Sequence, residues 1–153
     1  MSEHTALVAW THSRGDFLKG TYSREHTWTF DGGFVVPASP APTSVPVPFS
    51  NAANVDPEEA YIAALASCHM LNFLYLASKR GFQVAGYSDA AVGTMTKNQH
   101  GKLSIGSVVL DPRVAYQGPR PTPDEERQLH HAAHEECFLA NSVKTEVTVA
   151  GVQ

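Results

Sequence analysis

The sequence predicts an α+β fold, a sandwich in which antiparallel sheet packs on two main helices. Strand-like segments that alternate apolar and polar side chains lie in both the N-terminal and the C-terminal parts of the chain. Two other segments carry helix start signals, and no internal repeat divides the 153 residues. The composition, 42% hydrophobic and 17% charged, is that of a globular chain. We therefore expect one domain over residues 1–153.

Short strands in a meander are expected over residues 5–36. Side chains alternate between residues 22 and 30, and Asp-Gly-Gly at residues 31–33 is typical of a hairpin turn. Residues 37–55 follow as a proline-rich loop, because their five prolines exclude a helix or a central strand. Such a loop either covers a site or a partner chain, or simply connects two elements.

A long helix is expected over residues 57–80. Asp56 suits the N-cap, Pro57 suits the first helical position, and Gly81 provides a stop. Apolar and alanine side chains cover most of the helix circumference. The helix should therefore lie at the centre of the fold.

The remaining elements are a hairpin, a second helix and a final strand. Within residues 87–114, the two hairpin strands are expected at residues 87–96 and 103–114. A capping box at Thr122 predicts a helix over residues 123–137. Alternating valines and threonines predict a strand over residues 143–150.

Charge and hydropathy argue against several partners. The net charge of −4 and the scattered lysines and arginines give no basic field for nucleic acid. Ser67, His69 and Asn72 interrupt the long apolar helix, so we expect it to be buried in protein and not in a membrane. The first residues lack the basic and apolar regions of a secretory signal, and the expected location is cytoplasmic.

The chain has only two cysteines, Cys68 in "ALASCHMLNF" and Cys137 in "HAAHEECFLANS". Each is a candidate for simple packing in the core. If the two helices pack side by side, the thiols could also approach within disulfide distance and form a redox couple. Zinc held by both cysteines with His69 and His134 is a third interpretation, although Cys68 and His69 point about 100° apart on a helix.

A thiol on an apolar helix needs a nearby cation to favour the thiolate, because burial disfavours the charged form. Arginine suits this task, since it is always charged and offers paired donors. Arg24 in "YSREHTW" is the first candidate and Arg14 in "HSRGD" the second. Either can also be an ordinary hairpin arginine.

Two segments, "NVDPEEAYIAALASCHMLNFLYLASKRGF" and "AHEECFLANSVKTEVTV", together resemble the OsmC/Ohr family of thiol-dependent hydroperoxide reductases. The resemblance implies that Cys68 is the peroxidatic cysteine and Cys137 the resolving one. It also implies that Glu58 holds the activating arginine, assigned here to Arg24. The implied activity is reduction of an organic hydroperoxide to an alcohol, with regeneration by a dithiol reductant and without a metal or organic cofactor.

The same resemblance implies an intertwined homodimer with its sites at the subunit interface. Glu58 and Cys68 are ten residues apart, about 15 Å along one helix. One arginine cannot easily meet both from the same helix, so the partner chain is expected to supply Glu58. The histidine that follows Cys68 differs from the aromatic residue of some family branches. We expect His69 to hydrogen-bond within the core, with tuning of the thiol as the alternative.

Overall fold

A computed structural model describes residues 1–152 of the chain. The chain forms two compact units, Met1–Ala60 and Tyr61–Gln153. The order of elements is a group of strands, a helix, further strands, a second helix and a last strand. The α+β class with two helices and several antiparallel sheets is therefore confirmed. The single domain expected over residues 1–153 stays a prediction.

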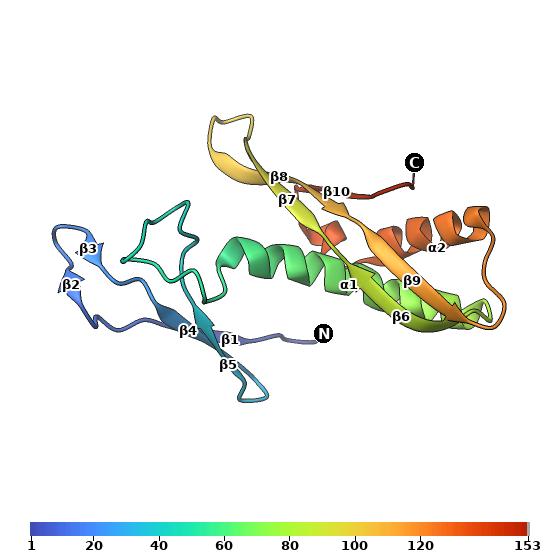
Figure 1. Ribbon diagram of the computed structural model, residues 1–153, viewed down its shortest axis with the longest axis horizontal. Helices are drawn as coiled ribbons and strands as arrows, with labels where there is room; N and C mark the ends of the chain where they lie inside the picture. The colour runs from blue at the N-terminus through green and yellow to red at the C-terminus, as the bar shows by residue number, and fades with distance from the viewer. Residues whose placement is uncertain (153) are drawn as a thin grey trace. The chain divides into compact units, whose positions relative to one another are not determined.

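The first unit contains the predicted meander (Figure 1). Its strands are β1 (Ala6–Ala9), β2 (Gly15–Asp16), β3 (Thr21–Tyr22), β4 (His26–Phe30) and β5 (Val35–Ala38). An antiparallel sheet has the order β1-β4-β5, while β2 and β3 form a separate ribbon. Pro37, expected in the loop, lies in β5, which is an edge strand and so tolerates a residue without an N–H.

Helix α1 (Pro57–Lys79) matches the predicted helix to within one residue. At its start the Asp56 carboxylate accepts a hydrogen bond from the Glu59 N–H at 2.8 Å, as expected of an N-cap. Beyond its end Gly81 has φ of +80°, a conformation that favours glycine.

Only one face of α1 is buried within a single chain. The buried side chains recur every four residues: Leu65, His69, Phe73 and Ala77. On another face Leu71 and Tyr75 are each 60% exposed. The helix is long and apolar enough to cross a membrane, as core helices of soluble proteins can also be. The central position expected for α1 is thus realised on one side only.

The predicted hairpin differs from the observed strands. Instead of two long strands there are four: β6 (Gln83–Asp89), β7 (Val92–Lys97), β8 (Leu103–Leu110) and β9 (Pro112–Gln117). β6 pairs with β9 and β7 pairs with β8, both antiparallel. The breaks coincide at Asp89 and Asp111, where the Asp89 carboxylate accepts the Asp111 N–H at 2.8 Å and replaces a backbone bond.

The last strand also corrects the expectation of a wholly antiparallel sheet. β10 (Glu146–Val149) is shorter than the predicted 143–150 and pairs with β8 in parallel. It closes a core of Leu65, Val108, Leu110 and Val149 against α1. The parallel arrangement arises because α2 carries the chain back before β10 begins, as a crossover connection does.

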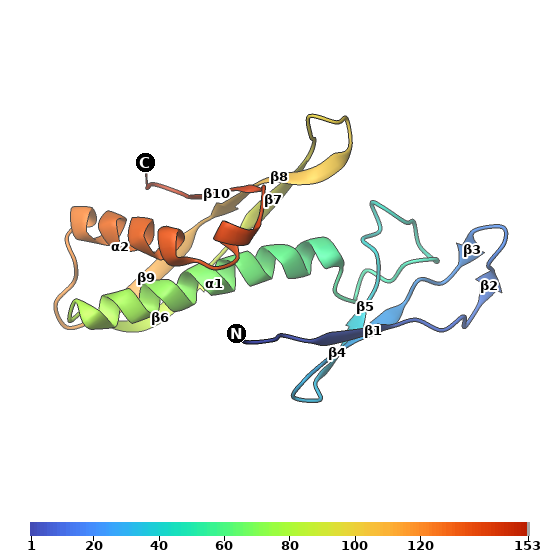
Figure 2. The same cartoon turned by 180° about the vertical axis from the view of Figure 1, so that it is seen from behind.

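Helix α2 (Pro123–Glu136) begins at the predicted capping box, in which Thr122 and Glu125 satisfy each other's backbone N–H groups. It lies beside the C-terminal half of α1 in both views of the fold (Figures 1 and 2). A second core forms there from Phe73, Ala77, Leu129 and Ala133. The helix ends one residue before the predicted 137, so Cys137 is its C-cap.

A pair of buried histidines joins the two helices. His69 Nε2 and His130 Nδ1 lie 3.0 Å apart, and the two ring planes are within 6° of parallel. Phe73 stacks on His130, with 4.3 Å between ring centroids. The expectation that His69 hydrogen-bonds within the core is confirmed. Burial, followed by the neighbouring His130 and His134, lowers the pKa of His69 from 6.5 to about 4.

This buried pair predicts a loss of stability in mild acid. Unfolded His69 takes up a proton near pH 6.5, whereas the folded ring resists it until about pH 4. The contribution of His69 to the free energy of unfolding should therefore be complete above pH 6.5. It should be lost as the pH drops towards 4, and the full pKa shift corresponds to about 3 kcal/mol. Urea unfolding at fixed protein concentration across this range measures the slope.

The variant His69→Gln should show a shallower slope than the wild type. His100 lies in the exposed turn between β7 and β8, so His100→Gln serves as the matched control and should keep the wild-type slope. An unchanged pH dependence in His69→Gln would assign the acid sensitivity to other groups.

Candidate functional site

Cys68 lies on α1 and is half-buried. One turn further along the helix, Asn72 Nδ2 donates to the Cys68 carbonyl at 2.9 Å and lies 3.9 Å from the sulfur. This placement follows from helix geometry, since residues four apart share a face. An amide donor at this position can stabilise negative charge on the sulfur, although a donor at 3.9 Å contributes little.

Cys137 is buried at the C-terminal end of α2, with 1% of its surface exposed. The short 3-10 helix Ala140–Ser142 follows, and the Ala140 N–H donates to the Cys137 sulfur at 3.4 Å. Burial raises the pKa of Cys137, and the neighbouring Cys68 thiol raises it further. The thiol of Cys137 is thus held in its protonated form beside Cys68.

The structure therefore brings the two sequence-predicted cysteines together, each as a free thiol. The contact depends on α1 and α2 lying side by side, as the sequence analysis required. Among residues 1–152, no group of three or more histidine, cysteine or acidic side chains is placed to hold a metal ion. His69 points into the helix interface and pairs with His130, and so does not join Cys68 in a common site.

Arg24 lies between β3 and β4 in the first unit. Its Nη1 donates to the carbonyls of Gly20 and Tyr22, at 3.0 Å and 2.7 Å, and its guanidinium stacks over the Tyr22 ring at 3.9 Å. These contacts occupy one nitrogen. Nη2 and Nε have no acceptor among the residues that the structure describes, so they are free to bind an anion or a peroxide.

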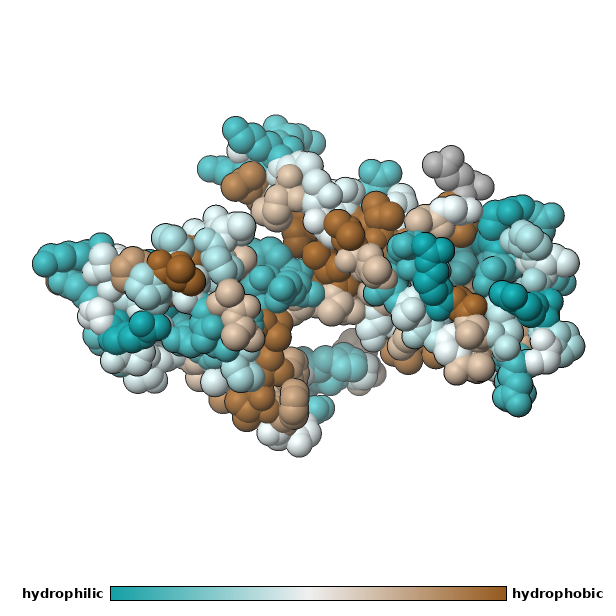
Figure 3. Space-filling view, in the orientation of Figure 1, coloured by the Kyte–Doolittle hydropathy of each residue, from teal (hydrophilic) through white to brown (hydrophobic). Residues whose placement is uncertain are grey.

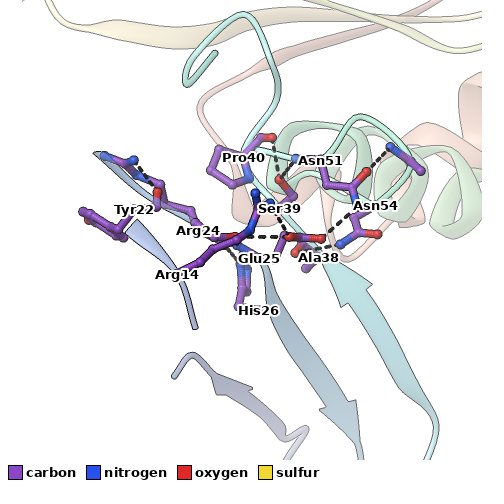
Figure 4. Close-up of polar contacts among 12 residues, drawn as sticks. Arg14, Tyr22, Arg24, Glu25, His26, Ala38, Ser39, Pro40, Asn51 and Asn54 are labelled. Carbon is purple, nitrogen blue, oxygen red and sulfur yellow. Dashed lines mark hydrogen bonds and ion pairs between the residues drawn. The ribbon is translucent and has the colours of Figure 1, made fainter. Parts of the chain in front are cut away.

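Arg14 is engaged differently, because it belongs to a polar cluster centred on Glu25 (Figure 4). The Glu25 carboxylate accepts hydrogen bonds from Arg14 Nη2 at 3.1 Å, Ser23 Oγ at 3.1 Å and Asn51 Nδ2 at 2.8 Å. These bonds, led by that of Asn51, lower the pKa of Glu25. Ser39 Oγ in turn accepts the Asn51 N–H at 2.8 Å, and the bond from Asn51 to Glu25 ties this loop after β5 to the segment between β3 and β4 that bears Arg24.

Glu58 lies in the first turn of α1 and is half-buried. Its neighbour Glu59 completes the cap by accepting the Asp56 N–H at 3.3 Å, so Glu58 is not needed there. In residues 1–152 no hydrogen bond or ion pair joins Glu58 to Arg24. The predicted pairing of these two side chains is thus not formed within one chain.

Sequence reasoning missed three features of this region. Asn72 could have been predicted, because a residue four positions after Cys68 on a helix lies on the same face. The His130 partner of His69 required knowledge of how two helices pack. The Glu25 cluster required the fold of the loop over residues 39–54, where the sequence signals only an extended connection.

The contact between the two thiols predicts that they bridge on mild oxidation. Treatment with diamide should convert Cys68 and Cys137 to an intramolecular disulfide, detected as the loss of two hydrogens by intact mass and as one crosslinked peptide after proteolysis. The variant Cys137→Ser should give no such peptide. If both thiols still react with an alkylating agent after diamide treatment, the two cysteines are not close enough to bridge.

Comparison with known proteins identifies the family. The model of the OsmC-like protein family matches residues 50–150. An OsmC-like protein of unknown function from Vibrio cholerae is 52% identical, with coverage of 97% of this chain and 98% of that one and a TM-score of 0.95.

An organic hydroperoxide resistance protein from Elizabethkingia anophelis is 15% identical, with coverage of 97% and 96% and a TM-score of 0.71. A second such protein, from Vibrio cholerae, is 17% identical, with coverage of 99% and 94% and a TM-score of 0.69. At this identity the likeness concerns the fold alone. No curated protein matches the chain. Because the family model covers most of the sequence and includes both cysteine segments, the chain belongs to the OsmC-like protein family.

Proposed function

We propose that this OsmC-like protein is a cytoplasmic thiol peroxidase that reduces organic hydroperoxides in defence against oxidative stress. The observation that carries the proposal is the contact between the Cys68 and Cys137 thiols. Two neighbouring cysteines in one chain, one on α1 and one at the end of α2, are what a reversible dithiol cycle needs. The distant relatives named as organic hydroperoxide resistance proteins share this fold.

In the first step the Cys68 thiolate attacks one oxygen of the hydroperoxide. The O–O bond breaks, the sulfur is oxidised to sulfenic acid, and the other oxygen leaves as an alkoxide that takes a proton to become the alcohol. Cys68 is only partly buried, which suits a sulfur that must meet a substrate. Asn72 contributes a donor beside the sulfur.

In the second step the Cys137 thiol attacks the sulfenic acid of Cys68. A sulfur–sulfur bond forms and water leaves, carrying the Cys137 proton and the sulfenic oxygen. A raised pKa suits Cys137 to this role, since a protonated thiol does not compete with Cys68 for the peroxide. A dithiol reductant then restores both thiols by disulfide exchange.

Arg24 is the better of the two candidate arginines for activating Cys68. Two of its nitrogens are free, whereas the Arg14 guanidinium is paired with Glu25 at 3.1 Å. The stack on Tyr22 holds the guanidinium of Arg24 in place without consuming its charge. In this proposal Arg24 polarises the peroxide, and Glu58 orients Arg24 through a pairing that forms only in the assembled dimer, since residues 1–152 of a single chain lack it.

We also propose that the active form is a homodimer in which Arg24 and Glu58 come from the chain opposite to Cys68. Large apolar side chains remain exposed on strands and helix alike, including Leu7, Phe34, Leu71, Tyr75 and Val92. Figure 3 shows such hydrophobic surface, in brown, on both units. A second copy would cover it, and helix length separates Glu58 from Cys68 on one chain.

The activity prediction is tested by consumption of cumene hydroperoxide with dithiothreitol as reductant. Cys68→Ser should abolish turnover, because no other thiol attacks the peroxide. Arg24→Lys should lower kcat/KM about 100-fold, because lysine lacks the paired donors. Arg14→Lys should have a much smaller effect.

Ser78→Ala is the matched control for Cys68→Ser, since Ser78 is on the same helix about 15 Å away. It should retain wild-type turnover. Full activity in Cys68→Ser would exclude the peroxidase proposal, and thiols that never react with peroxide would favour a binding function instead.

The shared site predicts complementation between two inactive variants. Cys68→Ser and Arg24→Gln subunits should each lack activity alone. After subunits exchange in an equal mixture, about half of the dimers are heterodimers, and each heterodimer has one intact site out of two. The mixture should therefore recover about a quarter of the wild-type rate. No recovery, with heterodimers verified by mass spectrometry, would place both residues of a site on one chain.

A further inference from the structure

A pocket of about 340 Å³ lies at the beginning of α2, away from both cysteines in sequence. Its lining includes Arg113 from β9, Arg120 from the following loop, and Arg127 and His130 from α2. The chain has only six arginines and a net charge of −4. Half of its arginines therefore face one pocket, and neither the fold nor the thiol chemistry requires this.

The arginines are only weakly neutralised. Arg113 pairs with Asp111 at 3.1 Å, but 78% of the Arg113 side chain is exposed, and such surface pairs are weak. Arg127 pairs with Asp124, three residues earlier on α2. Neither aspartate lines the pocket.

Arg120 has no ion pair among residues 1–152, and its guanidinium lies 5.9 Å from the centre of the Tyr116 ring. Among residues 1–152, Glu126 is the one carboxylate in the lining, and it accepts the Tyr116 hydroxyl at 2.7 Å. Three arginines against one glutamate leave the lining cationic.

His130 adds a buried polar group to the pocket wall. It is 4% exposed, and its Nδ1 meets His69 Nε2, which leaves Nε2 of His130 without a partner among the described residues. The remaining ring nitrogen of His69, Nδ1, is buried and unpartnered. A buried acceptor without a partner is tolerated better than a buried N–H. This favours a proton on His69 Nε2, and hence an N–H on His130 Nε2.

We propose that this pocket binds a small molecule through a phosphoryl group, either free phosphate or a phosphomonoester. Arginine guanidinium groups bind phosphate through paired hydrogen bonds, and the phosphoryl group carries nearly two negative charges at neutral pH. The His130 N–H supplies a further donor. The volume exceeds that of phosphate alone and leaves room for an organic part. This site is separate from the proposed peroxidase site and does not depend on it.

Calorimetric titration of the full chain tests the proposal, with phenyl phosphate, inorganic phosphate and succinate as probes. Saturable binding of phenyl phosphate is expected, with succinate at least tenfold weaker. Arg120→Gln should weaken phosphate binding about tenfold or more. Lys102→Gln, with the same change of charge in the exposed turn between β7 and β8, should bind as the wild type does.

NMR signals of the imidazole rings show where the probe binds, and those of His130 should shift on binding. Tighter binding of phenyl phosphate than of inorganic phosphate would identify a phosphomonoester as the ligand, and equal binding would identify free phosphate. Equal weakening in Lys102→Gln, equal binding of succinate, or unmoved His130 signals at saturation would each overturn the proposal. Arg120→Lys, which keeps the charge, provides the same test if Arg120→Gln does not fold.

Discussion

The packing of α1 against α2 is the constraint on which the rest of the structure depends. At this interface the nearly parallel His69 and His130 rings lie within hydrogen-bonding distance, and Phe73 stacks on His130. Cys137 lies seven residues after His130, about two helical turns, and therefore on the same face of α2. The contact that fixes the two helices thus also places the Cys137 thiol beside Cys68.

The helices could be predicted closely from the sequence because their ends are encoded locally. Asp56 and Thr122 act as caps through bonds to residues only three positions away. The hairpin could not be predicted as well, because its interruption depends on a long-range bond. Asp89 and Asp111 are far apart in the sequence, and the bond between them forms only after the strands have paired. Parallel pairing of β10 depends likewise on tertiary structure.

Within the candidate site, the two neighbouring cysteines were predictable from the sequence and their environment was not. The two cysteine segments identified Cys68 and Cys137, and the structure brings these side chains together. Their surroundings come from other parts of the chain. Glu25 gathers Arg14 and Asn51, which pairs the Arg14 guanidinium and fixes the loop beside the segment that bears Arg24. Such a cluster joins positions with no common sequence period, so no pattern signals it.

The position of Cys68 on α1 connects thiol chemistry to assembly. Residues three, four and seven positions after it, Leu71, Asn72 and Tyr75, share its side of the helix. Leu71 and Tyr75 are exposed, whereas Leu65 on the neighbouring face is buried. The thiol therefore lies on the border between the packed face of α1 and its uncovered face. Whatever covers that face also controls water and substrate at Cys68, so in the proposed dimer assembly itself completes the peroxide site.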